Sequence, residues 1–179
     1  VGPRGFEGKV IAAKYCRENN LTTLGIGLGM QVMAIEVARN ILGLADANSY
    51  EMNDQTKHRI VDIMEDLKSV GNPFGTMRRG AYDTVLVGGS KAAGAYGSEK
   101  ITERHYHRYE LNVEYREELE KAGLACTGEH PDSGLVDIVE VPACDWYVGA
   151  IYEPQYSSTV LHPSPLVMDF VKKIVERKG

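Results

Sequence analysis

The feature that most constrains the fold is a glycine-rich turn at residues 25–31, Gly-Ile-Gly-Leu-Gly-Met-Gln. The apolar run at residues 24–26 predicts a buried strand, and apolar residues at helical spacing over 30–42 predict a helix packed on it. In many α/β enzymes the middle residue of such a turn is a nucleophile, held over a helix N-terminus that favours developing negative charge. The middle residue here is Gly27, so the turn carries no nucleophile.

The remaining pattern predicts alternating helices and strands. A helix over about 8–19 has Val10, Ile11, Ala13 and Tyr15 available for burial. Period-two alternation predicts strands, and a proline at the first turn predicts the start of the last helix. The expected elements are a strand at 59–64, a hairpin opened by 75–80 and returning at 84–87, a strand at 103–112, a helix at 115–122, strands at 124–127, 135–141 and 147–152, and a helix at 165–177.

Composition limits the classes of protein to which the chain can belong. At 179 residues, with 43% hydrophobic and 25% charged residues, it suits a single domain over 1–179. The net charge of -5 indicates no nucleic-acid or membrane surface, and no apolar run reaches the roughly 18 residues of a spanning helix. Cys16, Cys126 and Cys144 lack Cys-x-x-Cys spacing, which favours reduced structural thiols in a cytoplasmic protein.

Several motifs resemble the class I glutamine amidotransferases, in particular the glutaminase domain of CTP synthase. They are the turn at 25–31, the Ile-Glu-x-Ala-Arg-Asn helix that follows, Asp-Ala-Asn-Ser-Tyr-Glu at 46–51, and Glu-Arg-His-x-His-Arg-Tyr-Glu-x-Asn at 103–112. The resemblance spans essentially the whole chain. It implies an α/β, flavodoxin-like, doubly wound and mostly parallel sheet with a small antiparallel hairpin, whose first strands would precede Val1.

The same resemblance implies where the catalytic triad of the family would fall. The family cysteine falls on Gly27, and the family motif Phe-His-Pro-Glu-Phe matches Tyr-Glu-Pro-Gln-Tyr at 152–156, so that Glu153 and Gln155 replace the histidine and the glutamate. Triad residues act as a unit, and the loss of one already removes most of the rate. We therefore expect that cysteine-dependent glutamine hydrolysis has been lost.

The resemblance also implies a ligand-binding set, all of which is retained. Leu28 would supply an oxyanion amide, while Gln31, Glu51 and Arg108, next to Tyr109, would hold the α-amino and carboxylate groups of glutamine. Physically, an arginine can hold a carboxylate with two parallel hydrogen bonds, and a glutamate can bind an ammonium group. The alternative is structural, with Gln31 capping the helix and Arg108 in an ion pair at a strand edge.

Residues 104–108 alternate basic and aromatic side chains. A strand would place Arg104, Tyr106 and Arg108 on one face and His105, His107 and Tyr109 on the other. No matching cysteine or carboxylate completes a zinc site, so we expect no metal and favour a pair of arginines that face an anion.

Three functional hypotheses follow. The first is a domain that has lost glutamine hydrolysis and binds or processes a small amino-acid-like ligand in the former glutamine pocket, without a cofactor and with Glu153 as acid or base. The second is a non-enzymatic pseudo-amidotransferase with a regulatory or interaction role. The third is part of an ammonia-dependent CTP synthase with an upstream synthetase-like domain. Homo-oligomerisation stays open in each case.

Overall fold

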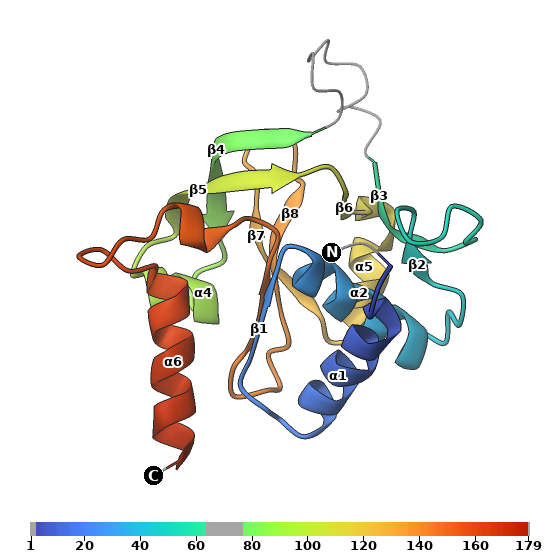
Figure 1. Cartoon of the computed structure of the whole chain (residues 1–179), viewed down its shortest axis with the longest axis horizontal. Coiled ribbons are helices and arrows are strands. Elements are labelled where there is room, and N and C mark those ends of the chain that lie inside the picture. Colours follow the sequence, from blue (N-terminus) through green and yellow to red (C-terminus); the bar gives the residue numbers. More distant parts are fainter. Residues whose placement is uncertain (1–2, 64–76, 179) are drawn as a thin grey trace.

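The computed structural model of the chain describes residues 3–63 and 77–178 (Figure 1). Its helical segments are α1 (Phe6–Glu18), α2 (Leu28–Asn40), α4 (Lys91–Tyr96), α5 (Arg116–Lys121), α6 (Pro165–Lys178) and the 3-10 turns η1 (Val113–Tyr115) and η2 (Pro154–Tyr156). Its strands are β1 (Thr23–Ile26), β2 (Asn48–Ser49), β3 (Arg59–Asp62), β4 (Arg78–Leu86), β5 (Lys100–His107), β6 (Glu110–Leu111), β7 (Ala125–Glu129), β8 (Val136–Glu140) and β9 (Tyr147–Ala150).

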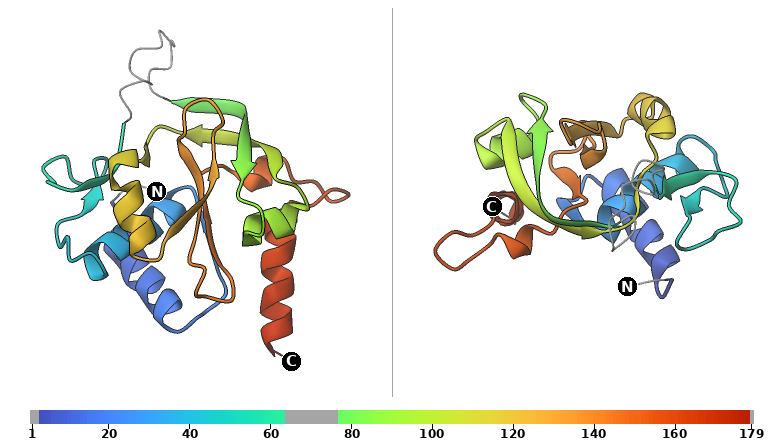
Figure 2. Two further views of the ribbon diagram at one scale, coloured as in Figure 1. Left: turned by 180° about the vertical axis from the view of Figure 1, so that it is seen from behind. Right: turned by 90° about the horizontal axis from the view of Figure 1, so that it is seen from above.

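The larger sheet has six strands in the order β1-β9-β8-β7-β4-β5. Strand β1 pairs with β9 in parallel, whereas the other four pairings are antiparallel. The view from above shows how strongly β4 and β5 curl (Figure 2). The predicted α/β class is confirmed, as a curled mixed sheet in which parallel pairing is less frequent than we expected. Short turns are sufficient to connect antiparallel neighbours such as β7 and β8.

A second, smaller sheet has the order β2-β3-β6. We predicted a single strand over 103–112, but the chain leaves the large sheet after β5 and joins the small sheet as β6 two residues later. There β6 pairs antiparallel with β3. The break places Arg108 and Tyr109 in a bend between the two sheets, which becomes important for the site.

The core lies on both faces of the large sheet. One cluster lies against α1, α2 and α5, and the other lies against α4 and α6. Side chains alternate between the two sheet faces along β8 and β9, so each strand contributes to both clusters. Val139 and Tyr147 belong to the first cluster, whereas Ile138 and Val148 belong to the second. Helix α2 is buried on nearly all sides and contributes Met30, Met33, Ile35 and Val37, among others, to the core.

Helix α1 packs on α2 with only part of the surface that we expected. Val10 and Ala13 are buried, but Ile11 and Tyr15 are 68% and 61% exposed. The two helices are also joined by an ion pair in which the Arg17 guanidinium donates to both oxygens of Glu36, at 2.8 and 2.7 Å.

One prediction fails at β4, and the helix that follows β4 was not predicted. The hairpin expected within 75–87 is absent from its described part, because residues 78–86 form one continuous strand paired with β5. Gly80 suggested a turn, yet its φ of 120° is accommodated within the strand. The opening residues 75–76, like residue 64 of the strand predicted at 59–64, lie outside the described residues. Helix α4 was not predicted, although Ser90 caps its start and Gly97 ends it in the left-handed conformation.

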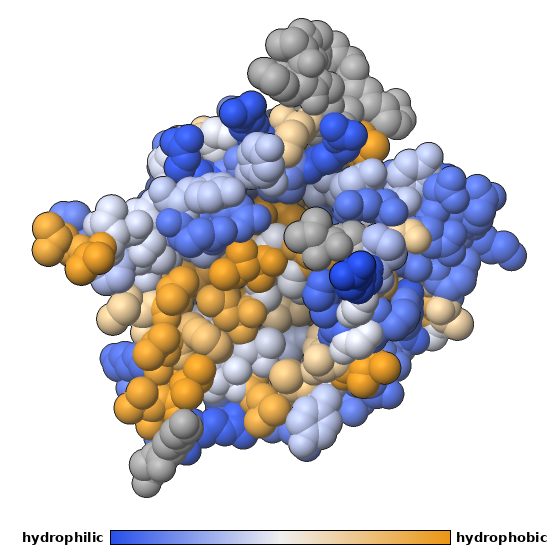
Figure 3. All heavy atoms as spheres, viewed as in Figure 1, coloured by the Kyte–Doolittle hydropathy of each residue, from blue (hydrophilic) through white to orange (hydrophobic). Residues whose placement is uncertain are grey.

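Hydrophobic side chains gather on the surface along α6 (Figure 3). Met168, Val171 and Val175 are exposed there, and Val160 and Leu161 are exposed in the preceding loop. Within the two described segments, no helix has the length and apolar character needed to span a membrane.

Candidate functional site

The turn between β1 and α2 has the geometry that its glycines predicted. Gly27 adopts φ 55° and ψ −112°, a conformation that favours glycine, and its N–H donates to the carbonyl of Ala150 at 2.8 Å. A Cβ atom on Gly25 would lie 2.8 Å from the backbone carbon of Gly29 and from the Met33 methyl group. Because Gly25 excludes a side chain, strand and helix approach each other closely. The nearest atom to a Cβ placed on Gly27 is Glu153 Oε1 at 3.1 Å, so the N-terminus of α2 stays open to the cavity.

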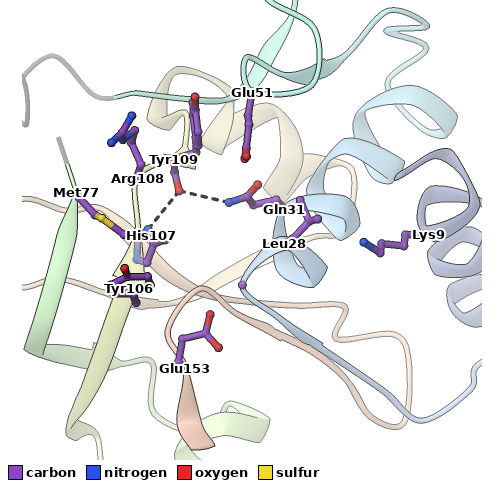
Figure 4. Close-up of a pocket in the computed structure, with 11 residues that line it drawn as sticks. Lys9, Leu28, Gln31, Glu51, Met77, Tyr106, His107, Arg108, Tyr109 and Glu153 are labelled. Carbon is purple, nitrogen blue, oxygen red and sulfur yellow. Dashed lines mark hydrogen bonds between the residues drawn. The ribbon is translucent and has the colours of Figure 1, made fainter. Parts of the chain in front are cut away.

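A cavity of about 650 Å³ lies over this turn. Figure 4 shows two ends, with Glu51, Arg108 and Tyr109 at one and Glu153 at the other. The lining residues come from α1, the β1–α2 turn, the loop after β2, the start of β4, the β5–β6 bend and the chain after β9. They are Lys9, Gly27, Leu28, Gln31, Glu51, Met77, Tyr106, His107, Arg108, Tyr109 and Glu153.

The first end of the cavity carries charged groups that have no partner among the described residues. Within residues 3–63 and 77–178, the side chains of Glu51 and Arg108 make no hydrogen bond or ion pair. The structural alternative for Arg108, an ion pair at a strand edge, is therefore not observed in this part of the chain. Burial, and next the negative charge of Glu51, raise the pKa of Tyr109, so its phenol remains protonated at neutral pH.

The bend that carries Arg108 is held by neutral hydrogen bonds. The Gln31 amide donates to the carbonyl of Tyr109 at 3.4 Å, instead of capping its own helix, and His107 Nδ1 lies 3.3 Å from the same oxygen. His107 Nε2 lies 2.9 Å from His105 Nδ1. Burial, and next the charge of Arg78, lower the pKa of His105 to about 2 and that of His107 to about 3. Both rings are therefore neutral. His105 Nδ1 donates to His107 Nε2, and His107 Nδ1 donates to the Tyr109 carbonyl.

Glu153 defines the second end. Its Oε1 lies 3.1 Å from the position that a Cβ on Gly27 would occupy. Its Oε2 accepts a hydrogen bond of 2.5 Å from the Gln155 amide. The carboxylate therefore lies over the open turn at the N-terminus of α2, where the helix dipole favours negative charge.

A buried charged cluster lies behind the bend. Arg78 pairs with Asp137 at 2.8 Å and with Glu110 at 3.3 Å, and Thr84 donates to Asp137 at 2.7 Å. Burial raises the pKa of Glu110 to about 8, since one guanidinium serves two carboxylates and lies closer to Asp137. His107 lies 3.4 Å from Glu110.

The structure brings most of the predicted site residues together. Gly27, Leu28, Gln31, Glu51, Arg108, Tyr109 and Glu153 line one cavity, and Gln155 contacts Glu153 from outside it.

Other parts of the prediction differ from the structure. Lys9, Met77, Tyr106 and His107 also line the cavity but were not proposed as ligand-binding residues. The predicted pair of arginines does not form there, since Arg104 is exposed on β5 and does not line it. A continuous strand would place His107 on the face opposite Arg108, whereas both residues line the cavity. Among the described residues no group of three or more His, Cys, Asp or Glu side chains could hold a metal ion.

Comparison with known proteins identifies close relatives. The chain is 56% identical over 176 residues to a CTP synthase of Bacteroides fragilis, and 54% identical over 177 residues to a CTP synthase of Porphyromonas gingivalis. These alignments cover 98% and 99% of this chain but 33% of each relative. The chain therefore spans about a third of the length of the curated relatives it matches.

Solved structures show the same similarity. The glutaminase domain of Trypanosoma brucei CTPS with bound acivicin superposes with a TM-score of 0.89 at 38% identity, covering 96% of this chain and 66% of that one. A glutamine amidotransferase from Thermotoga maritima reaches a TM-score of 0.54 at 10% identity, with 96% of this chain and 56% of that chain covered. This second similarity shows the fold alone.

These relatives overturn our functional expectation. We expected a domain that had lost glutamine hydrolysis and used its pocket, with Glu153 as acid or base, for another amino-acid-like ligand. That expectation is wrong, because relatives at 54–56% identity over nearly the whole chain are named CTP synthase, which supports a glutaminase-domain role and gives no sign of lost activity. The pseudo-amidotransferase and ammonia-dependent alternatives shared the premise of lost hydrolysis and are withdrawn with it.

The family model described as glutamine amidotransferase class-I matches residues 1–173, nearly the whole chain. Together with the open turn between β1 and α2 and the cavity above it, this match shows that the chain belongs to the class I glutamine amidotransferase family.

Proposed function

We propose that this chain has the role of the glutaminase domain of a CTP synthase and that its cavity binds L-glutamine. Relatives named CTP synthase, and the T. brucei glutaminase domain, support this role. Because the chain spans a third of those relatives, we also propose a synthetase-like part of the same protein. The proposal further includes self-association and a cytoplasmic location. Three free cysteines agree with a reducing compartment.

The proposal rests on a pair of charges at one end of the cavity that have no partner in the described part of the chain. Arg108 and Glu51 line it together, and neither side chain is engaged by another described residue. An α-amino acid carries a carboxylate and an ammonium group on one carbon, so a guanidinium and a carboxylate at one end of a cavity suit it. The cavity extends from there to the open N-terminus of α2, which would receive the ligand side chain.

A finer part of the proposal concerns the triad positions. Gly27 has the backbone conformation of the residue that is a nucleophile in related turns, and the contacts of Glu153 with Gly27 and Gln155 support placing all three at the positions of the family's Cys, His and Glu. Under this assignment the group that attacks glutamine is not a side chain of residue 27. Ammonia release therefore has to be measured directly, alongside binding.

Calorimetric titration of the full-length protein with L-glutamine tests the binding role. We expect saturable binding that weakens about 10- to 100-fold in Arg108→Ala, because a charged hydrogen-bonding pair is lost. Arg108→Lys keeps the positive charge but lacks the two parallel N–H donors of the guanidinium, so it should show an intermediate loss of affinity. Glutamine binding that is absent at millimolar concentration, or unaffected by both substitutions, would overturn the proposal.

The triad assignment is tested by the combined variant Gly27→Cys, Glu153→His, Gln155→Glu. If the three positions correspond, this variant should release ammonia from glutamine at least about 100-fold faster than Gly27→Cys alone, because a thiol needs its base and that base needs its orienting carboxylate. Acivicin, found bound to the T. brucei domain, serves as a second probe of the introduced thiol. Equal rates in the single and combined variants would contradict the assignment.

A further inference from the structure

The cavity end opposite Arg108 carries a carboxylate whose position is fixed by the backbone. The N–H of Glu153 donates to the carbonyl of Arg104 in β5 at 2.9 Å, and its own carbonyl accepts from the N–H of Tyr156 at 2.9 Å. The residue is therefore held between β5 and the 3-10 turn η2. Its side chain points from there into the cavity (Figure 4).

The two carboxylate oxygens of Glu153 have different environments. Oε2 accepts the hydrogen bond from Gln155, which fixes the rotation of the group. Oε1 faces Gly27 at 3.1 Å from the position of an added Cβ, and no described residue donates a hydrogen bond to it. The missing side chain at Gly27 is what leaves room for Oε1, which therefore has lone pairs available to a ligand.

An ionised carboxylate accepts hydrogen bonds but cannot donate them. A ligand whose α-carbon groups lie at Arg108 and Glu51 would extend its side chain toward Glu153. A carboxamide at that point offers two N–H donors, whereas a carboxylate offers none and adds like-charge repulsion. The geometry thus distinguishes two ligands of nearly identical shape, L-glutamine and L-glutamate.

We propose that Glu153 determines specificity at this site, its Oε1 accepting a hydrogen bond from the ligand carboxamide and thereby selecting glutamine over glutamate. This inference rests on the proposed glutamine-binding function. It assigns Glu153 a recognition role that needs no proton transfer, and it gives Gln155 the task of positioning Glu153.

The test compares the dissociation constants of L-glutamine and L-glutamate for the full-length protein by calorimetry. In Glu153→Gln the shape is kept and the charge removed, so the preference for glutamine over glutamate should fall at least about tenfold, mainly through tighter glutamate binding. Glu51→Gln is the matched control. It removes a carboxylate from the same cavity, but at the end that contacts the ammonium group shared by both ligands, so both should weaken with their ratio unchanged.

The outcomes separate the two proposals. Glutamine binding with a preference unchanged in Glu153→Gln would overturn this inference and leave the proposed function intact. A ratio altered equally by Glu51→Gln and Glu153→Gln would also overturn it, because general charge in the cavity would then explain selectivity. Failure of the unaltered protein to bind glutamine would overturn the proposed function and this inference with it.

Discussion

Two groups of charged side chains differ in what surrounds them. Arg78, Glu110 and Asp137 are at most 3% exposed and bind one another inside the fold. Arg108 and Glu51 are exposed at the cavity and are not paired with any described residue. The same residue types thus have two different roles. Buried polar and charged groups must be satisfied within the protein, whereas the cavity charges are left available to a ligand.

Among the variants that test this difference, Arg78→Met should cause the largest loss of stability. Replacing Arg78 leaves the buried Asp137 carboxylate without its cation and the Glu110 side chain without its hydrogen-bond donor, and we expect the free energy of unfolding to fall by about 3–5 kcal/mol. Urea denaturation followed by circular dichroism measures it. Arg108→Met is the matched control and should change stability by less than about 0.5 kcal/mol. Similar losses in both variants would show that the two groups do not differ as the structure indicates.

Gly27→Ala should have an intermediate effect at the cavity end. The backbone at Gly27 is unfavourable for other residues, and the new methyl group would crowd Glu153, so we expect a loss of about 2 kcal/mol in the free energy of unfolding. Adding Glu153→Ala should recover only the part of the lost stability that is due to crowding. Gly8→Ala in α1, where a Cβ meets nothing within 4 Å, should instead raise stability. A neutral Gly27→Ala would be inconsistent with this account.

The smallest expected effect is a pH dependence of stability that arises in the buried cluster. Glu110 keeps its proton in the folded state up to about pH 8 but loses it near 4.5 when unfolded, so its contribution falls as the pH rises through this range. His105 and His107 stay neutral when folded and take up protons near 6.5 when unfolded, so their contribution falls below that pH. Stability should therefore be greatest near pH 6.5.

Chemical denaturation at several pH values tests this dependence. Above pH 6.5 the Glu110 contribution acts alone, and we expect a decline of about 1 kcal/mol by pH 8. Glu110→Gln should abolish that decline, whereas Glu51→Gln should retain it. A decline of the same size in both variants would place its origin elsewhere.

The part of the site formed by local sequence could be predicted, and the part formed by long-range pairing could not. Alternate glycines after an apolar run specify the turn at Gly27 by backbone conformation alone, and the resemblance added Gln31, Glu51 and Arg108. Whether these residues share a cavity depends on the break between β5 and β6. A regular alternation over residues 103–112 conceals that break, because two short strands with nearly continuous periodicity look like one.

The inability to predict long-range pairing also explains the errors in the predicted fold. Gly80 suggested a turn because its conformational freedom is visible in the sequence, while the eight-residue register with β5 that keeps it within a strand is not. The buried cluster was missed because Arg78, Glu110 and Asp137 come from three separate strands. By contrast, Ser90 and Gly97 marked both ends of α4, and a search for capping residues would have found this helix.

The direct passage of the chain from one sheet to the other has a mechanical consequence. Residues 100–107 form β5 of the large sheet and residues 110–111 form β6 of the small sheet, with Arg108 and Tyr109, which both line the cavity, at the junction. A local opening of either sheet would pull on this junction and displace the wall of the cavity. The connection therefore couples fluctuations of the two sheets at the cavity, and a ligand that holds the junction in place would slow the opening of both.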